Sequence, residues 1–204
     1  AGTYTQSWAG NGAILRSDDR GATWKRTPLS IKLGGNENGR SVGERLAVDP
    51  NDTARLLFGS RDDGLWQSAD RAATWRKVDT FPITGRTNGV GIAFALFDAA
   101  SGRRGRPTPT AYVGVCAPGA ATLYRTTDAG ATWAAVPGQP GGGMLPHRAA
   151  LSADGRVLYI TYGNAPGPNG MTDGAVWKYD TRGGGGGGVW TDITPVRPGP
   201  AGGQ

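Results

Sequence analysis

The chain has one cysteine and one histidine, and both scarcities exclude classes of protein. Cys116 has no second cysteine in the 204 residues, so no intrachain disulfide framework can form. With His147 as the single histidine, a structural zinc site is excluded, because such sites need four Cys or His ligands. We therefore expect neither a metal nor a cofactor.

Long apolar runs and a concentrated basic surface are also missing. No stretch reaches the roughly 18 apolar residues of a membrane span, and no charged-then-apolar leader opens the sequence, so we expect no membrane partner. The 22 Lys and Arg residues outnumber the 16 Asp and Glu residues, but they are scattered. Nucleic-acid binding favours a basic stripe with stacking aromatics, and we expect no such partner. The one tight cluster, Arg103, Arg104 and Arg106, is predicted to be a solvated turn.

Glycine and proline are abundant instead. The 36 Gly and 14 Pro residues separate short apolar runs and do not gather into one low-complexity tract, which is typical of an all-β protein rich in turns. An eight-residue motif, hydroxyl-x-Asp-x-Gly-x-Thr-Trp, recurs at 17–24, 68–75 and 126–133. A decayed fourth copy lies near Asp180, with Trp190 as its tryptophan. A repeat with a period of about 50 residues indicates stacked supersecondary units.

Each copy of the motif, an Asp box, is predicted to be a hairpin turn. The aspartate accepts hydrogen bonds from nearby backbone N–H groups, and the glycine takes a positive φ without steric cost. Thr-Trp begins a strand whose tryptophan packs between neighbouring sheets. The alternative, catalytic acids or metal ligands, is less economical, because several copies of one motif are explained by several copies of one fold.

Four short strands surround each box, which is the blade pattern of a β-propeller. In the repeat that ends at 80 we predict strands near 45–48, 55–58, 65–68 and 74–78. In the later repeats we predict strands near 92–97, 111–115, 122–125, 132–136, 149–151, 157–162, 175–179 and 189–193. The first repeat has only 3–5, 13–16 and 23–26. The fold class is therefore all-β, with four-stranded antiparallel blades, three of them complete and one partial.

The repeat also predicts the organisation of the chain. A partial blade occupies 1–30, blades occupy 31–80, 81–137 and 138–194, and a Pro/Gly-rich linker occupies 195–204. All belong to one incomplete propeller, because three blades and a fraction cannot close a ring. We expect the rest of the propeller to lie in further sequence.

Function is expected on the face opposite the boxes, where the longer loops lie. These loops are 6–12, 30–43, 80–89, 138–146 and 163–174. The candidate substrate-binding residues on this face are Trp8, Asn11, Asn36, Arg40, Glu44, Arg45 and His147.

Each candidate also has a structural interpretation. Trp8 lies in a loop, where its ring offers a flat face to a sugar or packs under the loop itself. Arg40, Glu44 and Arg45 lie where a first strand begins beside the propeller axis, so they either form a bracing ion pair or contact substrate hydroxyls. His147 occupies the matching position of a later blade, where a lone histidine is more often structural or solvent-facing.

Several stretches resemble the xyloglucan-active enzymes of glycoside hydrolase family 74. The most specific are Tyr-Thr-Gln-Ser-Trp-Ala-Gly-Asn-Gly-Ala-Ile-Leu-Arg-Ser at 4–17 and the segments 32–36 and 39–50. Further matches are 136–140, 145–147, 158–162, 177–179 and 190–194. Ala72 in place of the box glycine, the Gly183–Gly188 run and the turn with Arg103 to Arg106 depart from the family pattern.

The resemblance implies two seven-bladed propellers that face each other across a cleft for a branched β-1,4-glucan. It implies a secreted, extracellular enzyme and inverting hydrolysis by two aspartates, one from each propeller, held roughly 6.5–9.5 Å apart to admit a water. In the family these aspartates lie outside the part matched here. The chain is therefore expected to supply cleft loops without the catalytic pair, and to be inactive alone.

Two other functions remain open. A sialidase also contains Asp boxes, and it needs three converging arginines, for which Arg40, Arg45 and Arg148 are the candidates. A non-catalytic propeller, such as a sortilin-like receptor domain or an assembly factor, would use the same scaffold only for binding. Two cleft aspartates in the flanking sequence would favour an enzyme.

Overall fold

The computed structural model describes residues 13–27, 29, 31, 42–43, 45–84, 91–167, 170–183 and 188–195. In this part of the chain the fold is all-β, as predicted, with one 3₁₀ turn, η1 (Ala99–Ser101). A two-stranded hairpin contains β1 (Leu15–Arg16) and β2 (Lys25–Arg26). The predicted strand at 3–5 lies outside the described residues.

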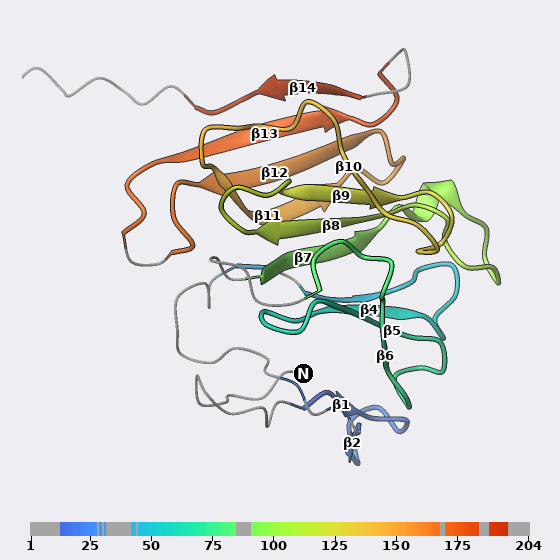
Figure 1. Cartoon of the computed structure of the whole chain (residues 1–204). Helices are drawn as coiled ribbons and strands as arrows, with labels where there is room; N and C mark the ends of the chain where they lie inside the picture. Colours follow the sequence, from blue (N-terminus) through green and yellow to red (C-terminus); the bar gives the residue numbers. More distant parts are fainter. Residues whose placement is uncertain are drawn as a thin grey trace, which may run out of the picture.

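Three four-stranded antiparallel sheets follow, each with its strands in sequence order. The first contains β3 (Leu46–Val48), β4 (Leu56–Gly59), β5 (Leu65–Ser68) and β6 (Arg76–Lys77). The second contains β7 (Gly91–Phe97), β8 (Ala111–Cys116), β9 (Leu123–Thr126) and β10 (Ala134–Ala135). The third contains β11 (Leu145–Leu151), β12 (Val157–Gly163), β13 (Gly174–Asp180) and β14 (Val189–Asp192). Figure 1 shows the sheets stacked in chain order, as blades are in a propeller.

Apolar side chains fill the space between successive sheets. Phe94, Tyr112 and Ile160 belong to the cluster between the second and third sheets, and each is at most 1% exposed. Leu65 and Val113 belong to the cluster between the first and second sheets. Each such buried side chain stabilises the fold by about 1.5–3 kcal/mol, so the two interfaces hold the stack together.

One strand starts earlier than predicted. The sequence indicated a loop through Pro146 and a strand at 149–151, but β11 begins at Leu145. Leu145 is 3% exposed in the core, and Pro146 pairs with Tyr162 before a bulge shifts the register. A proline that begins an edge strand disturbs no ladder hydrogen bond, which is why Pro146 did not end the strand.

The Asp boxes are hairpin turns, as predicted. In the first box the Asp19 carboxylate accepts hydrogen bonds from the Thr23 N–H at 2.8 Å and the Thr23 hydroxyl at 2.5 Å. The Ser17 hydroxyl accepts one from Gly21 N–H at 2.7 Å. Arg20 and Gly21 both have positive φ, the pattern of a type I′ turn. The same bonds recur at Ser68, Asp70, Ala72 and Thr74 and at Thr126, Asp128, Gly130 and Thr132.

The box carboxylates are committed to these bonds. Hydrogen bonds from the following threonine, first from its hydroxyl and then from its N–H, lower the pKa of Asp19, Asp70 and Asp128 to about 2. A carboxylate held ionised by its own turn is a poor general acid at neutral pH. The geometry therefore agrees with a structural role.

The decayed fourth box keeps one backbone bond of the others. Thr181 N–H donates to the Arg156 carbonyl at 2.9 Å, as Arg71 donates to Ala54 in the second box. The corresponding bond of the third box joins Ala129 to Pro109. The fourth hairpin thus docks on its sheet like its relatives, although its carboxylate–threonine bonds are absent from the described residues.

The box tryptophans pack against the preceding blade, with one exception. Trp133 is 9% exposed and meets Phe81 edge-to-face at 5.3 Å, and the Trp190 indole N–H donates to the Pro137 carbonyl at 3.0 Å. Trp75 packs against the cluster formed by Ile14 and its neighbours. Trp24 is 56% exposed, so the prediction that it packs between sheets is wrong for this copy. No described sheet lies on the side of β1 and β2 where its partner would stand.

Candidate functional site

The face opposite the boxes carries a hollow between two connections that are separated in sequence. The hollow holds about 280 Å³ and lies between the β8–β9 turn and the segment that leads from β10 to β11. Its lining residues are Ala117, Pro118, Gly119, Ala120, Thr122, Pro140, Gly141, Gly142, Gly143, Met144 and Leu145. In Figure 1 the β8–β9 turn is on the left, and the box turns are on the right.

Gln139 fixes the wall of the hollow. Its side-chain oxygen accepts hydrogen bonds from Thr122 N–H at 2.5 Å, from the Thr122 hydroxyl at 2.8 Å and from Leu123 N–H at 2.8 Å. Its side-chain nitrogen donates to the Val136 carbonyl at 2.7 Å. One side-chain amide therefore joins the start of β9 to the segment that follows β10. The hydrogen bonds of the Gln139 side chain therefore hold both sides of the hollow in place, so the hollow does not depend on loose loops.

The hollow suits a neutral polar ligand. No acid, base or thiol is among its lining residues, so it offers backbone N–H and C=O groups, the Thr122 side chain and small apolar surfaces. Such a surface can hold hydroxyl-rich molecules, but it has no group that transfers a proton. Behind it, burial raises the pKa of the Tyr162 hydroxyl well above its ordinary value, so Tyr162 stays neutral.

The two predicted site residues that the structure describes lie near the start of first strands on this face. Arg45 is half-buried directly before β3, and its carbonyl accepts a hydrogen bond from Gly59 N–H at 2.8 Å. His147 is half-buried as the third residue of β11, and its Nε2 lies 2.9 Å from the Ala165 carbonyl. Met171, which is 45% exposed, lies on the same side of Gly163 as this ring, because a Cβ added to Gly163 would meet both side chains.

Gly43 brings these two positions together. Its N–H donates to the His147 carbonyl at 2.9 Å, although Gly43 precedes the first sheet and His147 belongs to the third. Gly43 has φ +93°, and a Cβ at this position would stand 1.7 Å from the Ala93 carbonyl oxygen of β7. Only glycine permits this approach. The segment before β3 thus crosses β7 and reaches β11, which places Arg45 and His147 in one neighbourhood near the inner strands.

The other five candidates lie outside the described residues. They are Trp8, Asn11, Asn36, Arg40 and Glu44. Their assignment as substrate contacts stays a prediction, as does the possible ion pair of Glu44 with an arginine.

The sequence did not reveal the β8–β9 side of the hollow. The loops predicted for this face included 138–146 but not 117–122, because Pro118-Gly119 reads as an ordinary tight turn. In the sequence Gln139 stands out only as part of the similar stretch 136–140, because its bonds depend on a contact with Thr122, 17 residues away. One signal could have predicted the hollow: Pro118-Gly119 and the Gly141–Gly143 run face each other at the same end of one blade.

The described part of the chain also lacks two features. In the described ranges, no group of three or more His, Cys, Asp or Glu side chains is placed to hold a metal ion. No described helix is long and apolar enough to cross a membrane.

Comparison with known proteins shows what the chain is similar to. No protein-family model matches the chain. A xyloglucanase of Paenibacillus sp. is 53% identical over 207 residues, which cover 96% of this chain and 20% of that protein. Xyloglucanase Xgh74A of Acetivibrio thermocellus is 49% identical over 209 residues, which cover 96% of this chain and 24% of that protein.

Solved structures agree with the sequences. The crystal structure of the GH74 xyloglucanase from Xanthomonas campestris matches with a TM-score of 0.85 and 48% identity, covering 100% of this chain and 29% of that one. The chain therefore spans between a fifth and 29% of the length of these relatives. In sequence and in fold, the chain is homologous to one segment of the glycoside hydrolase family 74 xyloglucanases.

Proposed function

We propose that the chain is part of a glycoside hydrolase that cleaves xyloglucan or a related β-1,4-glucan. The observation that carries this proposal is the 53% identity to a xyloglucanase over 96% of the chain. The alignment spans the loops of both faces as well as the turns that many propellers share. We propose that the complete protein is secreted and acts outside the cell.

The segment itself supplies one wall of the substrate cleft. Its hollow is uncharged and rich in backbone polar groups, which suits a neutral glucan chain. Arg45 and His147 lie on the same face, and we propose that they contact the glucan together with Trp8, Asn11, Asn36, Arg40 and Glu44. The other wall belongs to a second propeller.

The chemical step belongs to residues outside this sequence. An inverting mechanism needs one carboxylic acid to protonate the leaving oxygen and one carboxylate to activate a water. The box aspartates do not supply this pair, because their carboxylates are ionised and held by their own turns on the far face. The segment orients the polymer while two aspartates, one from each propeller, cut it.

A bulky side chain in the hollow tests this assignment in the complete enzyme. Gly141 lines the hollow, a Cβ there meets no atom within 4 Å, and its φ is not positive, so Gly141→Trp fills space without backbone strain. We expect KM for xyloglucan to rise by about tenfold, equivalent to about 1.4 kcal/mol of lost binding, with kcat changed far less.

Two controls separate the hollow from other effects. Gly141→Ala should leave both kinetic constants near their original values, because it adds one methyl group to open space. Ala100→Trp places the same bulky ring on the exposed opposite face and should also leave KM unchanged. An unaltered KM in Gly141→Trp would remove the hollow from the substrate path.

A further inference from the structure

The connection between β7 and β8 carries three arginines whose side chains do not hold the described fold together. It spans 98–110 and is longer than the equivalent connections at 49–55 and 152–156. Arg103, Arg104 and Arg106 are exposed, and in the described ranges none of their guanidinium groups takes part in a hydrogen bond or an ion pair. We call these three residues the arginine tip.

The base of the connection is held by its own hydrogen bonds. Asp98 caps η1 by accepting from Ala100 N–H at 3.0 Å. The Ser101 hydroxyl donates to the Asp98 carbonyl at 2.7 Å and accepts from Thr110 N–H at 3.1 Å. The two ends of the connection are therefore fixed to each other before it reaches the tip.

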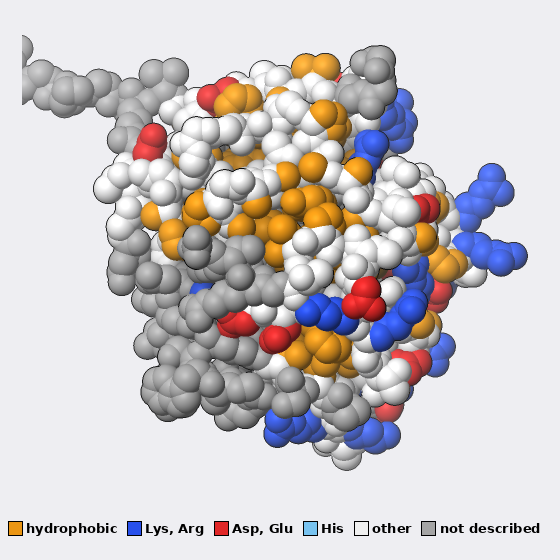
Figure 2. All heavy atoms as spheres, in the orientation of Figure 1, with side chains coloured by type: hydrophobic (Ala, Val, Ile, Leu, Met, Phe, Trp, Pro, Cys, Tyr) orange, Lys and Arg blue, Asp and Glu red, His pale blue; other side chains and the backbone are white. Residues whose placement is uncertain are grey.

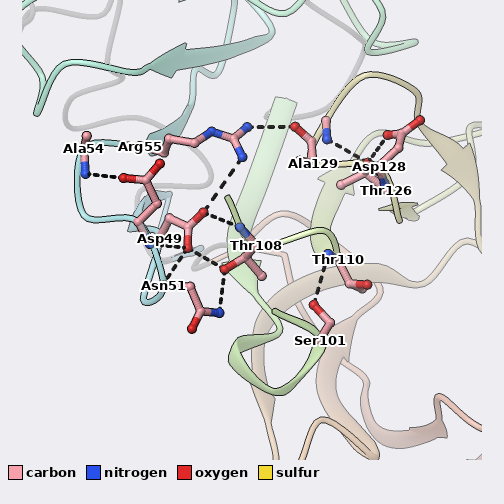
Figure 3. A network of polar contacts seen from close by, with 12 residues as sticks. Asp49, Asn51, Ala54, Arg55, Ser101, Thr108, Thr110, Thr126, Asp128 and Ala129 are labelled. Carbon is pink, nitrogen blue, oxygen red and sulfur yellow. Dashed lines mark hydrogen bonds and ion pairs between the residues drawn. The ribbon is translucent and has the colours of Figure 1, made fainter. Parts of the chain in front are cut away.

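The preceding blade holds the connection from the other side (Figure 3). Asp49 is fully buried, and its carboxylate accepts from Thr108 N–H at 2.8 Å and from the Thr108 hydroxyl. The Asn51 carbonyl accepts from Gly105 N–H at 2.7 Å, in the middle of the tip. The Asn51 side chain donates to the Ala99 carbonyl at 3.0 Å. The tip is thus an ordered platform and not a loose loop.

Three adjacent like charges on an ordered platform repel one another, and this repulsion brings no gain within the described fold. A bound polyanion would neutralise the three charges and so remove their repulsion. The ordered connection already positions the guanidinium groups for such a ligand. A guanidinium also matches a carboxylate in a bidentate pair. The tip therefore has the charge, the exposure and the order of a binding surface.

The tip is far from the hollow. The connection ends where β8 begins, whereas the hollow starts where β8 ends, and six residues of strand span about 20 Å. Figure 2 shows Lys and Arg side chains projecting into solvent at the right-hand edge, where Figure 1 draws this light-green connection. A polymer on the tip would leave the proposed glucan cleft open.

We propose that the arginine tip binds an anionic polysaccharide through the carboxylates of its uronic acid units. The connection contains no aromatic residue, so it offers no platform on which nucleic-acid bases could stack. The choice of a glycan as the polyanion rests on the proposed function, in which the protein works among polysaccharides. The tip would hold the enzyme on acidic polymers while the cleft works on a neutral one.

Affinity electrophoresis of the complete protein through gels with and without polygalacturonate tests this proposal. The test variant is Arg103→Gln, Arg104→Gln, Arg106→Gln. The matched control is Arg20→Gln, Arg76→Gln, Lys178→Gln, which removes three exposed cations elsewhere. Because exposed charge pairs are individually weak, we expect the three substitutions at the tip together to lower the affinity by about tenfold, and the control to change it by less than about twofold. Retardation should weaken as salt is added.

Three results would overturn the proposal: no retardation of the original protein, an equal loss in the control, or tighter tip-dependent binding to duplex DNA than to polygalacturonate. Cleavage of soluble xyloglucan is measured in parallel and should be the same in all three proteins. Absence of cleavage in all of them would refute the proposed function, whereas no retardation of the original protein together with intact cleavage would refute only the proposal for the tip.

Discussion

The residue that departs from its motif is Ala72. It stands where the other two complete boxes have glycine, and it keeps the same left-handed backbone with φ 64°, beside 92° at Gly21 and 85° at Gly130. A non-glycine residue in this region costs about 1–2 kcal/mol. The turn persists because Ala72 N–H still donates to the Ser68 hydroxyl at 2.9 Å.

Reciprocal substitutions should therefore have opposite signs. We expect Ala72→Gly to raise the free energy of unfolding by about 0.5 kcal/mol, because relief of strain exceeds the added freedom of the unfolded chain. We expect Gly130→Ala to lower it by about 1 kcal/mol, although space for the methyl group exists. Urea denaturation measures both values, and equal signs would contradict the strain argument.

The box carboxylates make stability depend on acid pH. The folded pKa of Asp19, Asp70 and Asp128 is about 2, below the unfolded value of about 3.9. Their stabilisation is therefore present above about pH 4 and is lost as the pH falls towards 2. We expect the melting temperature to drop across this window.

Thr132→Val provides the control for this pH dependence. It removes the hydroxyl that contributes most to the low pKa of Asp128. The fall in melting temperature between pH 4 and 2 should become shallower, while the melting temperature at pH 2 changes less than at pH 6. A slope identical to that of the original protein would show that the boxes do not set it.

At the scale of the element, Asp49 joins two blades. Its buried carboxylate accepts from Asn51 N–H at 2.9 Å, from Asp52 N–H at 3.2 Å and from both donors of Thr108 in the β7–β8 connection of the next blade. Arg55 stands 3.9 Å away and donates to the Ala129 carbonyl at 2.7 Å. One side chain therefore satisfies donors from two connections.

Replacement of Asp49 by asparagine should weaken this junction. An Asn side chain turns an N–H₂ group towards donors and removes the charge beside Arg55, so we expect a loss of about 2–3 kcal/mol in the free energy of unfolding. Asp52→Asn is the matched control, because Asp52 is only half-buried and its side chain accepts from Ala54 N–H at 3.2 Å. Its loss should stay below about 1 kcal/mol. Similar losses in the two variants would show that Asp49 contributes no more to stability than Asp52.

The elements were easier to predict from sequence than their contacts. The box spacing and the short apolar runs at Leu56–Gly59 and Val157–Gly163 are local features, so the strands and the propeller pattern were predictable. The crossing of Gly43 over Ala93 to His147 was not, since it depends on three sheets meeting. The exposure of Trp24 likewise depends on what stands beside the blade and not on the box itself.

At the scale of the whole molecule, the two faces carry different groups. The box face holds ionised carboxylates in turns and presents the arginine tip. The opposite face presents the uncharged hollow, and Arg45 and His147 also lie on it. The sequence predicted function on the face opposite the boxes, because each box marks the same end of its blade. It could not predict the hollow, which forms only when two connections separated in sequence are held together by Gln139.

The most direct test of the proposed function is the anomeric form of the first product that the complete protein releases from xyloglucan, followed by proton NMR. Inversion at a β-1,4 linkage predicts that the α-anomer of the new reducing end appears first and then mutarotates. The chain 1–204 alone should release no product. Absence of cleavage by the complete protein, or initial appearance of the β-anomer, would contradict the account.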